Sequence, residues 1–201
     1  MVVCPACAGE NLDGARFCSH CGRPLATISD AGGEAERKLV TVLFADIAGS
    51  TPLGEELDPE DLRDVLGSYA EAMREEIEGE GGTVEKFIGD AVMAVFGVPA
   101  AHEDDAVRAR RAALRMRRRL DVLNGDLERR HGVRLGMRVG VNKGEVLASK
   151  DARPEVGMVT GDAVNAAARL EQSAAPGQVL VSERTARSAP GFRFGEVGPS
   201  R

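Results

Sequence analysis

The apolar run from residue 39 to residue 45 is the feature that most constrains the fold. It reads Leu-Val-Thr-Val-Leu-Phe-Ala and leads directly into a carboxylate, Asp46. A strand with so little polar alternation needs cover on both faces, as in the centre of a sheet packed between helices. The residues that follow, Ile47 and then Ala-Gly-Ser-Thr at 48–51, are mostly too small to pack. The run therefore predicts a central strand that holds a carboxylate beside open space.

The rest of the main domain alternates between helical and strand patterns. Thr51-Pro52 predicts a helix start, with Thr51 as cap, and the acid-rich stretch after Asp58 predicts another. Residues 83–97 predict a β-hairpin whose turn is Gly89-Asp90. Further helices are expected over 59–78, 103–131, 162–173 and 184–189, and strands over 133–142, 144–149, 155–161 and 177–183. This order favours an α/β or α+β fold.

The cysteines are confined to the first 21 residues, at Cys4, Cys7, Cys18 and Cys21. Each Cys-x-x-Cys turn directs two thiolates to one point, and two such turns complete a tetrahedron suited to structural Zn²⁺. Unligated thiols or two disulfides are the alternative, and His20 is a possible further ligand. So small a module has little core, so metal binding would supply its folding energy.

Composition and charge set the domain plan and exclude some classes. We predict a zinc ribbon over 1–25, a Gly- and Glu-rich linker over 26–38 and a main domain over 39–201. The net charge of −6 argues against a general nucleic-acid binder. Neither a long apolar run nor a signal peptide is visible, so a cytoplasmic protein without membrane contact is expected.

Two aspartates are candidate metal ligands. If the 83–97 hairpin pairs beside the first strand, Asp90 and Asp46 reach the same edge of the sheet. Adjacent carboxylates repel unless a cation joins them, and such oxygen ligands suit Mg²⁺ or Mn²⁺. The small residues 48–51 would then bring backbone N–H groups close to bound phosphates. The alternative is that Asp46 caps a helix and Asp90 is an ordinary turn residue.

Three further side chains are candidates for nucleotide binding. Lys86 lies in the same hairpin as Asp90, although a strand lysine is usually just exposed. Asn165 and Arg169 are four residues apart on the predicted 162–173 helix and so share a face. An amide and a guanidinium on one face suit a sugar and a phosphate. The alternative is a solvated pair.

Four stretches together resemble the class III adenylate and guanylate cyclase catalytic domain. They are "VTVLFADIAGST", "GGTVEKFIGDAVMAVFG", "RVGVNKGEV" and "VTGDAVNAAARLEQ", in that order. The resemblance spans about Lys38 to Val197 and implies a ferredoxin-like α+β core. A zinc ribbon ahead of such a domain resembles a bacterial subgroup of the family.

The resemblance also implies a reaction and a set of roles. The reaction is conversion of ATP to 3′,5′-cyclic AMP and pyrophosphate by a head-to-tail homodimer, with two Mg²⁺ or Mn²⁺ ions at each interface site. One subunit would supply the metal ligands and the other the base, ribose and phosphate contacts. The implied metal ligands are Asp46, Asp90 and the Ile47 carbonyl; Gly49, Ser50 and Thr51 would hold the triphosphate, Lys86 and position 158 would read the purine, Asn165 would orient the ribose, and Arg169 would stabilise charge on the α-phosphate.

The sequence departs from the family pattern in two places. The second purine-reading position usually carries Asp or Thr, and here it is Met158, which is a poor hydrogen-bonding partner for adenine. Family domains also usually continue into a further strand with a basic residue, beyond the "FRFGEVGPSR" at which this chain ends. Two other functions therefore stay open: a non-catalytic nucleotide-binding or regulatory domain, and a zinc-ribbon adaptor that binds protein or nucleic acid, with the cyclase-like domain serving dimerisation.

Overall fold

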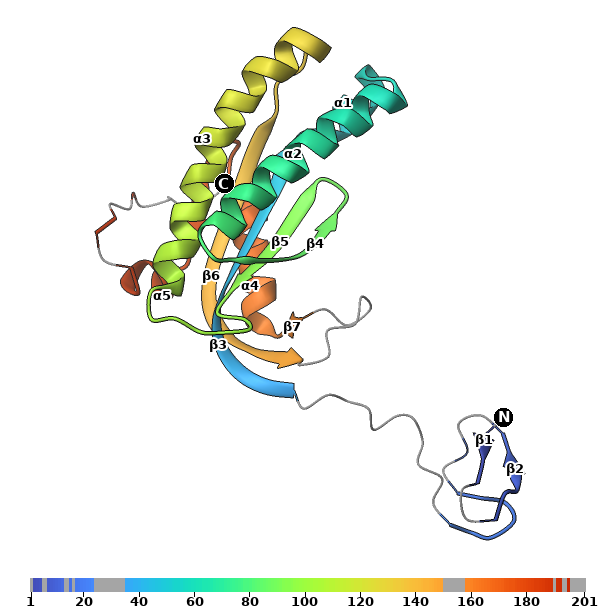
Figure 1. The fold of residues 1–201 in the computed structure, drawn as a ribbon. Coiled ribbons are helices and arrows are strands. Elements are labelled where there is room, and N and C mark those ends of the chain that lie inside the picture. The colour runs from blue at the N-terminus through green and yellow to red at the C-terminus, as the bar shows by residue number, and fades with distance from the viewer. Residues whose placement is uncertain are drawn as a thin grey trace.

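The computed structural model describes residues 2–4, 7–12, 15, 17–23, 35–149, 158–189, 191–192 and 195. A short N-terminal ladder precedes the main domain, which mixes helices with a curled, mostly antiparallel sheet (Figure 1). The strands are β1 (Val2–Val3), β2 (Glu10–Asn11), β3 (Ala35–Ala48), β4 (Thr83–Ile88), β5 (Ala91–Phe96), β6 (Gly136–Ser149), β7 (Val159–Thr160) and β8 (Val179–Val181). The helices are α1 (Ser50–Glu56), α2 (Pro59–Gly79), α3 (Asp105–His131), α4 (Asp162–Ser173) and α5 (Glu183–Arg187).

The main sheet is built around the two longest strands. Its order is β4-β5-β3-β6-β7, and β8 pairs in parallel with β6. β3 and β6 run antiparallel over their whole length, from Ala35 opposite Ser149 to Ala48 opposite Gly136. The predicted central strand is therefore confirmed, although it begins four residues earlier, at Ala35.

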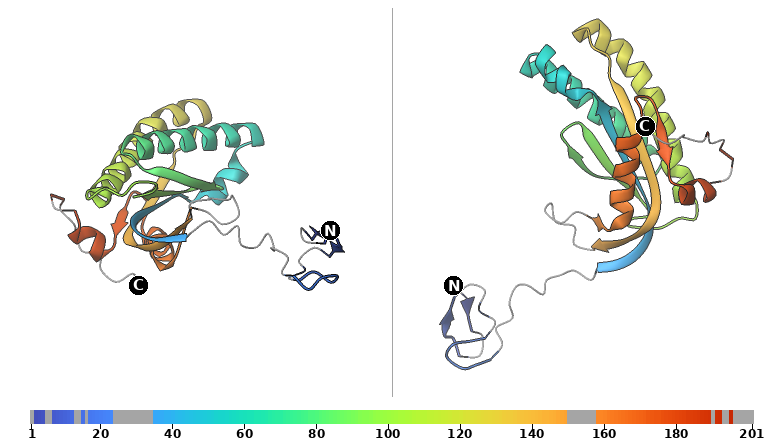
Figure 2. Two further views of the ribbon diagram at one scale, coloured as in Figure 1. Left: turned by 60° about the horizontal axis from the view of Figure 1, so that its bottom comes forward. Right: turned by 180° about the vertical axis from the view of Figure 1, so that it is seen from behind.

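Helices cover the sheet on both faces, as the apolar run predicted. α2 and α3 pack against each other and cover one face, while α4 lies on the opposite face, as the view from behind shows (Figure 2). The larger core lies under α2 and α3 and includes Leu43, Tyr69 and Phe96. The smaller core, under α4, includes Val42, Met93 and Ala167. This two-sided burial explains the uninterrupted apolar sequence of β3.

Two predicted boundaries are wrong for identifiable reasons. Residues 133–142 and 144–149 were expected as separate strands, yet β6 continues through Gly144. That glycine does not break the strand; it makes room for α4, because a Cβ there would lie 2.6 Å from the Cβ of Ala163. The predicted cap at Thr51 is also wrong, because α1 begins at Ser50 with Gly49 as its N-cap. The other predicted cap is confirmed, since Asp58 accepts from the Asp61 N–H at 2.9 Å.

Arginines of α3 pair with acids of the neighbouring helix. Arg115 contacts Glu76 at 2.8 Å and Glu80 at 3.2 Å, and both acids belong to or directly follow α2. Arg110 is buried, and its guanidinium stacks 3.9 Å from the ring centroid of Phe192. These contacts give Arg110 and Arg115 structural partners within the domain. Within the described part of the chain, none of the helices is both long enough and apolar enough to cross a membrane.

Candidate active site

Asp46 and Asp90 meet at one end of the β3–β5 pair. Ala45 of β3 is paired with Val92 of β5, so the residue after Ala45 and the turn before Val92 lie at the same end. The turn forms because Gly89 adopts a positive φ of 64°, which favours glycine. The predicted hairpin and its position beside the first strand are both confirmed.

The two carboxylates repel each other. Burial raises the pKa of Asp46, and a hydrogen bond from Arg138 lowers it. The nearby Asp90 carboxylate raises the pKa of Asp46 again, because two negative charges side by side disfavour each other. In addition, Oδ2 of Asp90 is buried with no hydrogen-bond partner among the described residues. A half-buried pair of acids with an unsatisfied oxygen has the character of a site for a hard cation.

Arg138 and Glu171, which the sequence patterns did not single out, complete this cluster. Nη2 of Arg138 donates to Oδ2 of Asp46 at 2.5 Å, and its Nε lies 3.1 Å from Oε1 of Glu171. Glu171 is 6% exposed, and burial raises its pKa while Arg138 lowers it. The register that places Arg138 opposite Asp46 was the missing information, because the two lie 92 residues apart in the chain.

The residues fit a divalent metal site with room for phosphate beside it. The carboxylates supply hard oxygen ligands, and Ile47, whose buried side chain is a hydrocarbon, could add only its backbone carbonyl oxygen. Gly49 has a φ of 75°, and nothing lies within 4 Å of the Cβ position it lacks. The backbone therefore turns at Gly49, beside open space, and enters α1 at Ser50. The side chain of Thr51 is not among those that the structure describes.

Lys86 lies in β4, and Met158 lies just before β7 on the α4 face of the sheet. Lys86 of β4 is opposite Met93, and its side chain is 44% exposed. Met158 directly precedes β7 and is half-buried against the core under α4. Thus the cation predicted to read a base is accessible, whereas the methionine is partly engaged in packing.

Asn165 and Arg169 lie on the outward face of α4 and are exposed, as their spacing predicted. The inward face of α4 packs closely on β6 because Gly140 has no side chain. A Cβ at Gly140 would lie 2.3 Å from both the Ala167 oxygen and the Glu171 nitrogen. The helix therefore sits directly on the strand through its small residues, with Asn165 and Arg169 exposed and Glu171 buried beside Arg138.

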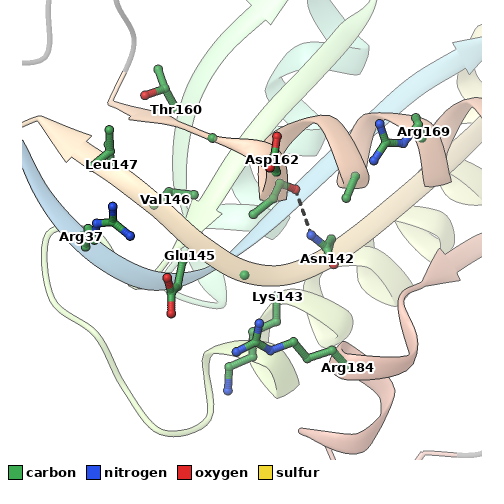
Figure 3. A pocket seen from close by; sticks show the side chains of 14 residues that line it. Arg37, Asn142, Lys143, Glu145, Val146, Leu147, Thr160, Asp162, Arg169 and Arg184 are labelled. Carbon is green, nitrogen blue, oxygen red and sulfur yellow. Dashed lines mark hydrogen bonds between the residues drawn. The ribbon is translucent and has the colours of Figure 1, made fainter.

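Arg169 lines a pocket of about 700 Å³ that Asp46 and Asp90 do not line. Figure 3 shows the pocket along β6, with Asp162 and Arg169 projecting from α4. Nδ2 of Asn142 donates to the Ala163 oxygen at 2.9 Å and holds the first turn of α4 over the strand (Figure 3). One chain therefore carries the acid pair and the Asn165–Arg169 pair at separate places.

The four cysteines gather into one cluster at the N-terminus. Their Sγ atoms all lie within 4.8 Å of one another, with Cys4 and Cys21 3.7 Å apart and Cys7 and Cys18 3.6 Å apart. These separations exceed a disulfide bond and match the edges of about 3.8 Å expected for a tetrahedron with Zn–S bonds of about 2.3 Å. Burial raises the pKa of Cys18, but the N–H groups of Cys21 and His20 bring it down to about 6.

The exposed His20 is not part of this cluster, and its ring contacts Ser19 instead. The N–H groups that face Cys18 stabilise a thiolate, which is the form that binds a metal. The donor set therefore fits a closed structural zinc site.

Comparison with known proteins places these features in a family. Residues 34–200 match the model of the adenylate and guanylate cyclase catalytic domain, and residues 3–25 match that of a zinc-ribbon domain. An adenylate cyclase of Anabaena cylindrica is 32% identical over 146 residues, which is 69% of this chain and 28% of the relative. An adenylate cyclase of Rhizobium meliloti is 34% identical over 70% of this chain and 21% of the relative. The chain thus spans less than a third of the length of these relatives.

Solved structures of both nucleotide specificities share the fold. The guanylyl cyclase Cya2 superposes with a TM-score of 0.75 at 32% identity, over 83% of this chain and 84% of that one. The adenylyl cyclase CyaB from P. aeruginosa gives a TM-score of 0.72 at 36% identity, over 77% and 82%. The α+β cyclase fold and the cysteine cluster are thereby both accounted for: this chain belongs to the adenylate and guanylate cyclase family and carries an N-terminal zinc-ribbon domain.

Proposed function

We propose that this chain is an adenylate cyclase that converts ATP to 3′,5′-cyclic AMP and pyrophosphate. The observation that carries the proposal is the meeting of Asp46 and Asp90, whose mutual repulsion and unsatisfied oxygen call for a cation. Two Mg²⁺ or Mn²⁺ ions held by these carboxylates and the Ile47 carbonyl would activate the ribose 3′-hydroxyl and neutralise charge on the leaving pyrophosphate. The zinc ribbon carries a structural Zn²⁺.

The protein side chains bind and orient the nucleotide. The backbone at Gly49 and Ser50 approaches the triphosphate, and Arg138 adds a cation beside Asp46 for the same phosphates. Asn165 orients the ribose, and Arg169 stabilises the charge that develops on the α-phosphate. Lys86 donates to the purine.

A homodimer is required because one chain does not complete the site. Asn165 and Arg169 lie on the outward face of α4, away from the acid pair. A head-to-tail arrangement lets the outward face of one subunit meet the acid pair of the other, which produces two equivalent sites. A protein partner for the zinc ribbon is compatible with the exposed Phe17 and Leu12 of that module.

A guanylate cyclase is the second candidate, because Cya2 and CyaB share this fold with similar identity. The side chain at position 158 is a methionine, which cannot hydrogen-bond a purine edge well, so Lys86 carries most of the choice between bases. Its donor-only ammonium favours adenine, whose N1 accepts, over guanine, whose N1 carries a hydrogen.

The test uses purified protein with Mn²⁺ and either ATP or GTP. We expect cyclic AMP as the main product, and no product from Asp46→Ala. Asp126→Ala is the matched control, because Asp126 is an exposed acid whose ion-pair partner is the exposed Arg129. Folded, dimeric protein that binds ATP but forms no cyclic nucleotide would overturn the enzymatic proposal in favour of a regulatory nucleotide-binding domain.

A further inference from the structure

A β-bulge in β4 brings two consecutive residues together. The pairing of β4 with β5 shifts register between Val84 and Lys86, so Glu85 is an extra residue in the strand. Consecutive strand residues normally point to opposite faces, whereas a bulge redirects them. Here the Lys86 Nζ lies 3.6 Å from Oε1 of Glu85, and the two form an ion pair.

The two members of this pair differ sharply in exposure. The Glu85 side chain is 3% exposed, and that of Lys86 is 44% exposed. Neither carboxylate oxygen of Glu85 has a hydrogen-bond partner within the described residues. Burial raises the pKa of Glu85, whereas the charge of Lys86 and the N–H groups of Met158 and Val159, which face the carboxylate beyond hydrogen-bond geometry, lower it. A buried carboxylate without hydrogen bonds destabilises a fold unless a neighbouring cation compensates its charge.

Glu85 also bridges two segments that are remote in the sheet. β4 and β7 stand at opposite ends of the order β4-β5-β3-β6-β7. The curl of the sheet nevertheless brings the backbone at Met158 and Val159 to the Glu85 carboxylate. One buried acid therefore lies in the strand that carries the accessible cation and faces the backbone of the segment that carries the methionine.

We propose that Glu85 is a positioning residue that fixes the Lys86 ammonium against the Met158 segment and thereby sets the preference for adenine over guanine. This inference rests on the proposed function. Lysine has a long, flexible side chain, and its ammonium only donates hydrogen bonds. The Glu85 carboxylate, 3.6 Å from the ammonium, attracts it by charge and favours one position of that group, which suits N1 of adenine and opposes the N1–H of guanine. Without Glu85 the ammonium samples several positions, and this discrimination weakens.

The test is Glu85→Gln, which keeps the side-chain shape and removes the charge. We expect the KM for ATP to rise about fivefold, with kcat within twofold of wild type and the KM for GTP unchanged. Glu36→Gln is the matched control, because Glu36 pairs with Lys38 at the same 3.6 Å distance on an exposed part of β3. We expect that control to leave both nucleotides unaffected.

A double variant distinguishes a role of Glu85 in positioning Lys86 from a purely structural role. In Lys86→Met protein, adding Glu85→Gln should change neither KM further, because the group that Glu85 positions is gone. An equal loss for ATP and GTP, or the same Glu85→Gln effect in the Lys86→Met background, would overturn the proposal and show a structural role.

Calorimetric binding keeps this inference separable from the proposed reaction. The 3′-deoxy analogues of ATP and GTP, which lack the hydroxyl that would attack the α-phosphorus, are titrated into wild-type, Glu85→Gln and Glu36→Gln protein. Weaker binding of the ATP analogue alone to Glu85→Gln supports the proposal even if the wild-type protein forms no cyclic nucleotide, a result that would refute only the cyclase activity. Wild-type protein that binds the ATP analogue no more tightly than the GTP analogue would overturn the assignment of Glu85.

Discussion

The guanidinium of Arg138 donates to the Oδ2 of Asp46 across 2.5 Å, from directly opposite positions on β6 and β3. The same guanidinium lies 3.1 Å from Glu171 of α4. A hydrogen bond to the charged form favours that form, so Arg138 lowers the pKa of Asp46 against the effects of burial and of Asp90. Arg138 therefore keeps a candidate metal ligand ionised inside an acidic cluster.

Arg138→Met should make metal binding more sensitive to acid. Without the guanidinium the pKa of Asp46 rises, and protons then compete with the metal at higher pH. We expect the pH at which Mn²⁺ affinity falls to half its plateau to move up by about one unit. Calorimetric Mn²⁺ titrations between pH 5 and 8, a range above the ordinary Asp pKa of about 3.9, measure this. Arg134→Met is the control, because Arg134 pairs with the exposed Glu128 instead; an unmoved midpoint in Arg138→Met would contradict the interpretation.

Mixing two inactive variants should restore activity. Asp46→Ala removes a metal ligand and Arg169→Ala removes the phosphate contact, and in a head-to-tail dimer the two belong to opposite subunits at each site. A mixed dimer then has one intact site, so an equal mixture should recover about a quarter of wild-type activity. Cyclic AMP formation after co-refolding or co-expression provides the measurement. Asp46→Ala mixed with Asp90→Ala is the control, and it should stay inactive because both ligands come from one subunit.

Gly140→Ala should destabilise the main domain through the α4 contact. The added Cβ would lie 2.3 Å from backbone atoms of Ala167 and Glu171, which cannot move aside without lifting the helix. Overpacking of this kind costs about 1–3 kcal/mol, or a melting temperature about 3–10 °C lower. Gly136→Ala in the same strand is the control, because its Cβ would meet nothing nearer than 3.5 Å. Equal melting temperatures for the two variants would show that α4 does not depend on this close approach.

Zinc should be confined to the cysteine cluster and should stabilise that module. Cys18→Ser is expected to lose the single bound Zn²⁺, while His20→Ala should retain it because His20 is not in the cluster. The cysteine core and the two cores of the main domain share no residue among those described. We therefore expect a protease to cleave Cys18→Ser protein within residues 1–25. We also expect the unfolding transition of the main domain to stay at the wild-type temperature. Metal analysis measures the bound zinc, limited proteolysis the cleavage, and calorimetry the unfolding transition. A lower unfolding temperature of the main domain in Cys18→Ser would show that the zinc module stabilises that domain.

The sequence indicated the elements of the site well where local patterns carry the information. Apolar burial on both faces identified β3, the Gly89-Asp90 dipeptide identified the hairpin, and helical spacing placed Asn165 and Arg169 on one face. Cysteine spacing was equally informative, because two Cys-x-x-Cys turns restrict the geometry of four sulfurs. In each of these cases the constraint acts within about twenty residues of chain.

Strand register and sheet curl were decided by the tertiary structure alone. Nothing local pairs Arg138 with Asp46, directs Glu85 toward Met158, or shows that Gly144 continues a strand beneath α4. These relationships join segments far apart in the chain, and they depend on which strands become neighbours and how closely a helix packs on them. By itself, the sequence determined which residues are candidates for the chemistry; packing of the whole domain decided which charges meet, because pairing between distant strands is a property of the assembled sheet.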